Sequence, residues 1–354
     1  MLLLTSTAFS ASVDKEKTIR KSFPVNASTS VEIKTRYTNV DIKTWDRDSA
    51  VFKIMVRAQH KNEETALELA EEIEIRFSES GNYIVAETDF GDESNRLLTG
   101  ILSFADALTS SKPSLLISYT VYVPNYVPLR IENKYGDIGI SDYKGNIKIE
   151  HSHGDLRLGD VEGYLDLDLK FADLNANNLK RLNLDVEYGD VVLFKVENAD
   201  ISSKSSKLNI HEAGRIRCRS KRDDYSFYKV QSINSDATYT DFVITELIGN
   251  LSFTGKYGNV TIHNVRKGFD KINMNCESSN ANISFEDGCA FAVDITLEDG
   301  DLSYPQQLKG IQKKNMDDDD DVSVNYFGTV GTTGKANSSL EIFGENTDIN
   351  LTLK

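Results

Sequence analysis

The chain has 354 residues, with 55 acidic against 40 basic side chains and a formal net charge of -15. The charge predicts a soluble protein that repels nucleic acid and anionic lipid, because both are polyanions. No apolar run approaches the roughly 20 residues that a membrane-spanning helix needs, and three cysteines with five prolines exclude a disulfide scaffold and a Pro-rich stalk. The length allows a large core and two structural units.

The N-terminus reads MLLLTSTAFSASVDKE and predicts export. Leu2 to Leu4 followed by small residues resemble the end of a signal-peptide h-region, and Ala8-Phe9-Ser10 has the small residues that a signal peptidase reads. We therefore expect residues 1–11 to be a signal-peptide remnant and the protein to reside in the periplasm or on the cell surface. No cysteine follows the small residues, which argues against a lipid anchor there.

Residues 12–130 are predicted to form a β-rich capping region with a helical insertion. VFKIMVRA (51–58) has the composition of a strand, and RYTNVDI (36–42) resembles the units that repeat later in the chain. NEETALELAEEIEI (62–75) has apolar residues at helical spacing after a capping Asn62, which predicts a short helix. LLTGILSFADAL (97–108) predicts an amphipathic insertion.

The region 131–304 contains an internal repeat, visible in KYGDIGI, EYGDVVL and KYGNVTI. The acid or amide of this motif recurs at spacings of 17 or 18 residues, with 23 and 19 at the end. The marked positions are Asp137, Asp155, Asp173, Asp190, Lys207, Asp224, Asp241, Asn259, Asn282 and Asp301. A fixed period of this size is typical of a stacked solenoid.

Within each unit the apolar residues alternate in two short runs, which is strand periodicity. Ile138 with Ile140 and Ile147 with Ile149 form the two runs of one unit. Such a unit is too short for a β-α-β crossover. We therefore predict an all-β fold, a parallel β-helix of about ten 17–18-residue coils whose strands pair with their copies one coil on, at about 4.8 Å.

Counting by twos along the second run predicts that the aromatic of the motif points inward, because Leu184 and Val186 lead to Tyr188. Glycine is then expected at the corner, where positive φ is needed. The predicted inward aromatic ladder comprises Tyr135, Phe171, Tyr188, Tyr239 and Tyr257. An exposed ladder that stacks on sugars is the alternative to this interior stack.

The acid or amide of the motif is predicted to point outward and to cap turn amides. This outward turn ladder comprises Asp137, Asp155, Asp173, Asp190, Asp241 and Asn259. Stacked oxygen ligands could instead bind calcium, although the paired-glycine nonapeptide of calcium-binding rolls is missing. Residues 305–354 are predicted to form an acidic loop, with Asp317–Asp321 solvated or binding calcium, and closing strands in which SSLEIFGENTDINLTLK completes the last coil.

The alternation KYGDIGI…KGNIKI…HGDLRL…EGYLDLDL resembles bacterial exported candidate adhesins with β-strand repeats of head-domain type, a domain of unknown function. SFPVNASTSVEIKTRYTNVDIKTWD, VYVP and GKANSSLEIFGENTDINL are similar to the same family, so the resemblance runs from about Phe23 to Leu353. It implies a periplasmic or surface β-helical protein, and it supplies no catalytic residues.

RIRCRSKR (215–222) is the concentrated basic segment of this acidic chain. It places Arg215, Arg217, Arg219 and Lys221 on the outward face of one strand, where an acidic glycan or partner could dock. The alternative is pairing between coils, since Asp200 lies one coil earlier, opposite Arg217.

The histidines and cysteines do not indicate a functional site. His151 and His153 are spaced for one strand face, but no third metal ligand is identifiable. Cys218 falls on the inward phase as a small core residue, and Cys276 and Cys289 could pair after export. We therefore predict no metal and no cofactor.

A nucleophile elbow, a zinc helix, a phosphate loop and a redox cysteine pair are all missing from the sequence. We accordingly predict a non-enzymatic, adhesin-like protein that presents an elongated surface to glycan or protein partners. An envelope structural or sensory component with a protein partner is the alternative. A polysaccharide lyase or hydrolase is a third, based only on analogy of fold.

Overall fold

The computed structural model describes residues 13–60, 62–90, 114–316, 323–331 and 337–354. Its contacts divide the chain into two compact units, residues 1–154 and 155–354. The predicted signal remnant, the amphipathic insertion at 97–108 and the run Asp317–Asp321 lie outside the described residues. Within the described ranges, no helix is long and apolar enough to cross a membrane.

The first unit is built on parallel pairs that form short coils. β2 pairs in parallel with β8, β8 with the start of β10, and β3 with β9, so RYTNVDI belongs to a coil of the same kind as the later repeats. The backbone amide of Asp137 donates to Asn39 Oδ1 at 3.0 Å, which links the two corners. The elements of this unit are β1 (Val13–Pro24), β2 (Ser30–Lys34), β3 (Thr38–Thr44), β4 (Ser49–His60), α1 (Glu63–Glu72), β5 (Glu74–Ser80), β6 (Tyr83–Asp89), β7 (Ser114–Val123), β8 (Leu129–Lys134), β9 (Ile138–Ile140) and the first part of β10 (Ile147–Leu158).

Antiparallel strands end the parallel stack of the first unit. β4 pairs antiparallel with both β1 and β7, and β5 pairs antiparallel with β6. The predicted helix is confirmed as α1, whose N-cap Asn62 accepts from the Glu64 amide at 2.8 Å. Its apolar stripe of Ala66, Leu69 and Ala70 is buried, and α1 lies against β1 and β4. Together these elements keep the first parallel pairs from presenting an open edge.

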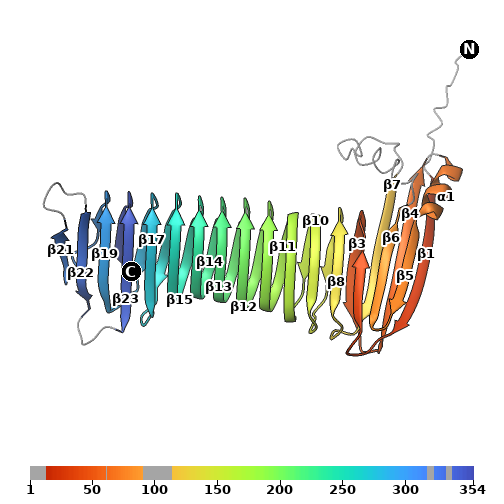
Figure 1. Ribbon diagram of the computed structural model, residues 1–354, viewed down its shortest axis with the longest axis horizontal. Helices are drawn as coiled ribbons and strands as arrows, with labels where there is room; N and C mark the ends of the chain where they lie inside the picture. The colour runs from red at the N-terminus through yellow and green to blue at the C-terminus, as the bar shows by residue number, and fades with distance from the viewer. Residues whose placement is uncertain (1–12, 61, 91–113, 317–322, 332–336) are drawn as a thin grey trace, which may run out of the picture. The chain divides into compact units, whose positions relative to one another are not determined.

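The second unit is the predicted parallel solenoid. β11 to β15 pair in parallel, and Val191, Leu208, Tyr225 and Phe242 occupy one register at 17-residue intervals. Figure 1 shows these strands side by side. The elements are β11 (Val161–Glu187), β12 (Asp190–Lys204), β13 (Lys207–Lys221), β14 (Asp224–Thr238), β15 (Asp241–Lys256), β16 (Val260–Val265), β17 (Lys271–Glu277), β18 (Ala281–Phe285), β19 (Phe291–Glu298), β20 (Leu302–Ser303), β21 (Ile311–Asn315), β22 (Ser323–Val330), β23 (Ser338–Glu345) and β24 (Ile349–Leu353).

Each coil of this unit has two runs, and their inward residues meet in one core. Phe242, on the first run of β15, stacks on Tyr225 of the preceding coil at 4.9 Å between ring centroids. It also meets Phe253, on the second run of the same strand, edge to face at 5.5 Å. All three rings are buried. The chain is therefore an all-β protein of open β-solenoid type, as the repeat predicts, and it has a first-run face and a second-run face toward solvent.

The C-terminal strands are inserted between two coils. β23 pairs in parallel with both β17 and β19 and lies between them in Figure 1. β24 pairs in parallel with β18 and β20. The stack then ends in β22, antiparallel to β19, and β21, antiparallel to β22. The strand pattern of 338–354 is confirmed, but its expected position is wrong: this segment fills the place before the coil of β19 instead of completing the last coil.

One repeat mark is also corrected. Val260 pairs with Ala281, so the residue equivalent to Asn259 is Asn280 and the predicted mark Asn282 is two residues late. Asn280 Oδ1 accepts from the Asp348 amide at 3.2 Å, and Asp348 Oδ1 accepts from the Asp301 amide at 3.1 Å. With Asn280 as the mark, the last two spacings are both 21 residues (280 − 259 and 301 − 280), and only the second spans the inserted coil of Asp348.

Candidate binding surfaces

The aromatic residues of the motif are exposed, which corrects the predicted inward ladder. Phe171 is 54% exposed and Tyr239 is 52% exposed, and Tyr188 and Tyr257 are exposed as well. Tyr135 is half-buried. All five have positive φ, between 52° and 61°. A left-handed residue reverses the strand alternation, so counting by twos fails at this position.

The residue after each aromatic takes the inward position instead. Ala172, Gly189, Thr240 and Gly258 are buried at this corner. A Cβ on Gly258 would lie 2.0 Å from the Thr240 carbonyl oxygen, so the glycine is required by close backbone approach. The positive φ predicted for the glycine therefore belongs to the aromatic before it.

The corner rings stack on one another along the solenoid. Phe171 lies 4.8 Å from Tyr188, and Tyr239 lies 4.9 Å from Tyr257, with interplanar angles of 6° and 17°. In the first unit Tyr135 stacks between Tyr37 and His153. A sugar binds to the face of a ring, and here a neighbouring ring covers at least one face of each ring, which leaves less ring surface for a sugar. The ladder itself is therefore a poor sugar platform.

The outward acid and amide side chains link one coil to the next. Asp173 Oδ1 accepts from the Asp190 amide at 2.9 Å, and Asp241 Oδ1 accepts from the Asn259 amide at 2.8 Å. These residues are exposed, and Asp137 and Asp155 are half-buried. The predicted capping of turn amides is thus observed for these pairs, between successive coils. In the part of the chain that the structure describes, no group of three or more ligands could hold a metal.

Some corners of the second unit lack the aromatic. Ser205 and Arg222 replace the aromatics, and Asp223 occupies the inward position at 3% exposure. Its carboxylate accepts from the hydroxyls of Ser203 and Ser220 at 2.7 and 2.6 Å. It also accepts from the backbone amides of Ser206 and Lys221, at 2.7 and 2.9 Å. Four donors satisfy a buried carboxylate, so Asp223 holds the corner together.

The arginine row, defined as Arg215, Arg217, Arg219 and Lys221 of β13, is exposed on the second-run face. Arg217 pairs with Asp200 at 3.0 Å, as the register predicts, and Arg215 donates to Asn198 at 3.5 Å. Arg219 makes no ion pair with any residue that the structure describes. The next coil opposes the row with Ser232, Asn234, Asp236 and Thr238. The row is thus only partly neutralised.

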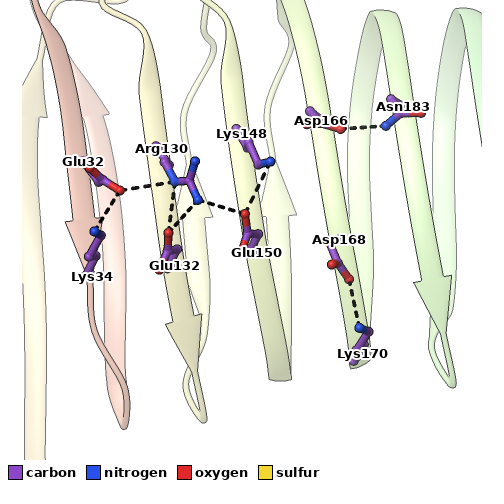
Figure 2. Close-up of polar contacts among 10 residues, drawn as sticks. All are labelled: Glu32, Lys34, Arg130, Glu132, Lys148, Glu150, Asp166, Asp168, Lys170 and Asn183. Carbon is purple, nitrogen blue, oxygen red and sulfur yellow. Dashed lines mark hydrogen bonds and ion pairs between the residues drawn. The ribbon is translucent and has the colours of Figure 1, made fainter.

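Arg130 of the first unit, in contrast to the arginine row, is neutralised by carboxylates. Its guanidinium contacts Glu32 at 3.2 Å, Glu132 at 2.7 Å and Glu150 at 3.0 Å (Figure 2). Contact with these carboxylates raises the pKa of Arg130 above its ordinary value, although burial opposes the rise. Three carboxylates leave this cation little capacity for a ligand. Among the described residues, the arginine row has one carboxylate in ion-pair contact, Asp200, while Asp236 lies opposite Arg219 in the next coil without forming an ion pair.

Carboxylates gather on the same face of the second unit, before the arginine row. Asp166 accepts from Asn183 at 2.7 Å and Asp168 lies 3.8 Å from Lys170 (Figure 2). Burial first, and then repulsion from Asp168 and Glu187, raise the pKa of Asp185. Arg219 acts against this shift. Lys170 opposes the rise in the pKa of Asp185 more strongly than Arg219 does.

A polar groove of about 450 Å³ lies farther along the second-run face. It is lined by two rows of outward side chains that run across four strands. The first row is Ser252, Asn273, Glu341 and Asp294, and the second is Thr254, Asn275, Phe343 and Thr296. The insertion of β23 brings Glu341 and Phe343 into these rows. Strand alternation alone could not have placed them there.

A cluster of outward apolar and aromatic side chains lies on the first-run side of the second unit. We call it the apolar face and define it as Val192, Phe194, His211, Tyr228 and Val243. Four of its members are exposed large apolar residues, and a groove of about 530 Å³ lies over them. His211 stacks between Phe194 and Tyr228, at 5.1 and 4.6 Å. This surface was missed by sequence reasoning. The signal was present, because apolar residues at outward positions break the alternation.

Of the remaining candidates, all except His153 are buried. His151 is buried beside the Asn133 carbonyl at 3.3 Å, whereas His153 is exposed and stacks on Tyr135. They do not form a shared site. Cys218, Cys276 and Cys289 are free and buried, so Cys276 and Cys289 do not form the disulfide considered above. Burial raises the pKa of Cys218 and of Cys276 to about 12.

Comparison with known proteins agrees with this architecture. The family model described as Toastrack DUF4097 matches residues 28–352. The chain belongs to this family. The predicted resemblance to adhesin-like domains of unknown function is thereby confirmed. No curated protein matches this Toastrack chain.

Solved structures similar to the Toastrack chain share little sequence with it. A candidate cell-adhesion protein from Clostridium sporogenes is 10% identical, covers 96% of this chain and 100% of its own, and has a TM-score of 0.20. A candidate adhesin from Bacteroides fragilis is 11% identical, with coverage of 95% and 97% and a TM-score of 0.29. Another, from Parabacteroides distasonis, is 12% identical, with coverage of 94% and 97% and a TM-score of 0.28. At these TM-scores the likeness carries no argument about function.

Proposed function

We propose that this protein is an exported, adhesin-type envelope protein and that its arginine row binds acidic residues of a glycan. The partly neutralised arginine row is the observation that carries the proposal. A guanidinium binds a carboxylate through two parallel hydrogen bonds, and side chains on one strand repeat at fixed spacing. A polymer with recurring carboxylates matches such a row. The family resemblance and the signal-like N-terminus support the envelope location.

Binding of uronate oligosaccharides, measured by calorimetry on the full chain, tests the arginine row. The variant Arg215→Gln/Arg217→Gln/Arg219→Gln should bind at least about tenfold more weakly, because it removes the guanidinium groups that contact the ligand. A tenfold loss of affinity corresponds to about 1.4 kcal/mol. The control Lys195→Gln/Lys207→Gln/Lys229→Gln also removes three positive charges, but from the first-run face. It should bind as tightly as the parent does. Equal losses in both variants, or no binding of any acidic glycan by the parent, would contradict the proposal.

A second function, recognition of an envelope protein, is favoured by the apolar face. Contiguous exposed apolar side chains mark interaction surfaces. Four carboxylates, Asp173, Asp190, Asp224 and Asp241, follow the corner beside it. A partner with apolar residues flanked by basic ones would match both features.

Site-specific crosslinking in cells tests the apolar face. A photoreactive residue at Ser226, beside the face, should give a discrete adduct with an envelope protein. The same residue at Asn234, on the opposite face, should not. The adduct should disappear in Phe194→Ser/Tyr228→Ser. Adducts of equal yield at both positions would argue against a dedicated partner here.

A further inference from the structure

The polar groove has hydrogen-bonding groups that no other side chain uses. In the described part of the chain, the side chains of Ser252, Thr254, Asn273 and Asn275 form no hydrogen bond, and all four are exposed. Each amide offers two donors and an acceptor, and each hydroxyl offers both. The hydroxyl groups of a pyranose need that mixture of donors and acceptors.

The carboxylates of the polar groove already have partners. Glu341 accepts from Lys271 at 2.6 Å, and Asp294 accepts from the Asn325 amide at 2.8 Å. The residues that line the groove include no lysine or arginine. An anionic ligand would therefore meet two carboxylates and no available cation. An uncharged ligand can donate hydroxyl protons to the same oxygens, so charge selects a neutral ligand.

Phe343 supplies the apolar part of the polar groove. Its side chain is 41% exposed, and no other ring in the described residues stacks on it. This distinguishes it from Phe194 and Tyr239, which have rings stacked against them. The register places Phe343 between Asn275 and Thr296. An uncovered ring face beside amides matches a sugar, which has an apolar C–H face and polar edges.

We propose that the polar groove is a binding site for neutral pyranose residues of a glycan, with one sugar packed on Phe343 and its hydroxyls bonded to Asn273 and Asn275. This site is additional to the acidic-ligand site of the arginine row and has different chemistry. Both lie on the second-run face, and β14 separates β13 from β15. A pyranose advances a glycan chain by roughly one strand spacing, so successive residues can meet successive strands.

Saturation-transfer NMR and calorimetry with uncharged oligosaccharides of glucose, galactose, mannose and N-acetylglucosamine test the inference on the full chain. At least one probe should bind the parent. Phe343→Leu, which keeps an exposed apolar side chain, should weaken that binding about tenfold, and Phe343→Trp should retain it. Tyr83→Leu, which removes an exposed ring of β6 outside the proposed binding surfaces, is the matched control and should change nothing.

Further outcomes separate this site from the arginine row. Asn273→Ala/Asn275→Ala should also weaken neutral-sugar binding about tenfold while leaving the binding of uronate oligosaccharides unchanged. The Arg215→Gln/Arg217→Gln/Arg219→Gln variant should show the reverse. The inference is overturned if no uncharged probe binds, or if Tyr83→Leu weakens binding as much as Phe343→Leu does. Failure of uronate binding alone would leave it standing.

Discussion

Left-handed backbone at non-glycine residues is a strained local feature of the coil. It recurs at Tyr135, Phe171, Tyr188, Tyr239 and Tyr257, and a non-glycine residue there costs of order 1–3 kcal/mol. Stacking between neighbouring rings returns about 0.5–1.5 kcal/mol per pair and offsets part of that cost. Stacking of rings on the outside of the coil therefore explains why an aromatic residue occupies this strained corner position.

Tyr239 isolates this backbone effect, since its φ is 55° and its ring stacks on Tyr257. Tyr239→Asn and Tyr239→Val both remove the stacking. Asparagine tolerates the left-handed region and valine does not, so we expect Tyr239→Val to be less stable than Tyr239→Asn by about 1–2 kcal/mol. Urea denaturation of both variants measures the difference. Equal stabilities would mean that the corner relaxes to another conformation.

The buried thiols give a prediction about pH. Burial keeps Cys218 and Cys276 protonated up to about pH 12, whereas an unfolded thiol ionises near about 8.5. The unfolded chain therefore loses these protons first, and the free energy of unfolding should fall as the pH rises from about 9 to 12. Unfolding measured across this range should be less pH-dependent in Cys218→Ala.

An aromatic disulfide reagent at pH 8 should label the thiols only after unfolding, and rapid labelling of the native chain would contradict their burial.

The position of each side chain relative to the core was predictable only where the backbone is extended. Alternation correctly assigns Leu184 and Val186 to the interior. It fails at Tyr188, because one left-handed residue reverses the phase. Periodicity contains no information about where φ changes sign. The exposure of Phe194 was readable from the same alternation, since an aromatic at an outward position is an exception to it.

At the scale of elements, the inserted C-terminal coil is the feature that sequence order hides. The alternation of apolar residues identifies β23 and β24 as a coil, but it does not indicate which coils they pack between. The alternation of Leu340 and Ile342 fits any position in the stack equally well. β23 also completes the polar groove, so the most specific of the candidate sites depends on a contact between distant segments.

Leu340, which is fully buried in β23, tests the insertion. Leu340→Ala should cost about 2–5 kcal/mol. Because β23 lies between β17 and β19, amide protection should fall in both of these strands. Hydrogen exchange resolved by strand measures it. The control Leu193→Ala, in β12, should reduce protection in β11 and β13 and leave β19 unchanged. Loss of protection confined to β23 and later residues would show that β17 and β19 pair directly.

At the scale of the whole molecule, a net charge of -15 opposes the proposed binding of an acidic glycan. The attraction is local, at the arginine row, and the repulsion comes from the rest of the surface. The two differ in range. The Debye length falls from about 30 Å at 0.01 M salt to about 8 Å at 0.15 M, so moderate salt screens distant carboxylates more than it screens contacts within the row.

The affinity for a uronate oligosaccharide should therefore pass through a maximum as salt increases. It should rise between about 0.01 and 0.1 M, as long-range repulsion is screened, and fall at higher salt, as the contacts with arginine weaken. Calorimetric titrations at stepped salt concentration measure this, and a neutral oligosaccharide in the polar groove is the control, whose affinity should stay flat. A steady decline from the lowest salt would show that the arginine row dominates the field at all distances. A steady increase would show that the row contributes nothing and that the acidic ligand binds elsewhere.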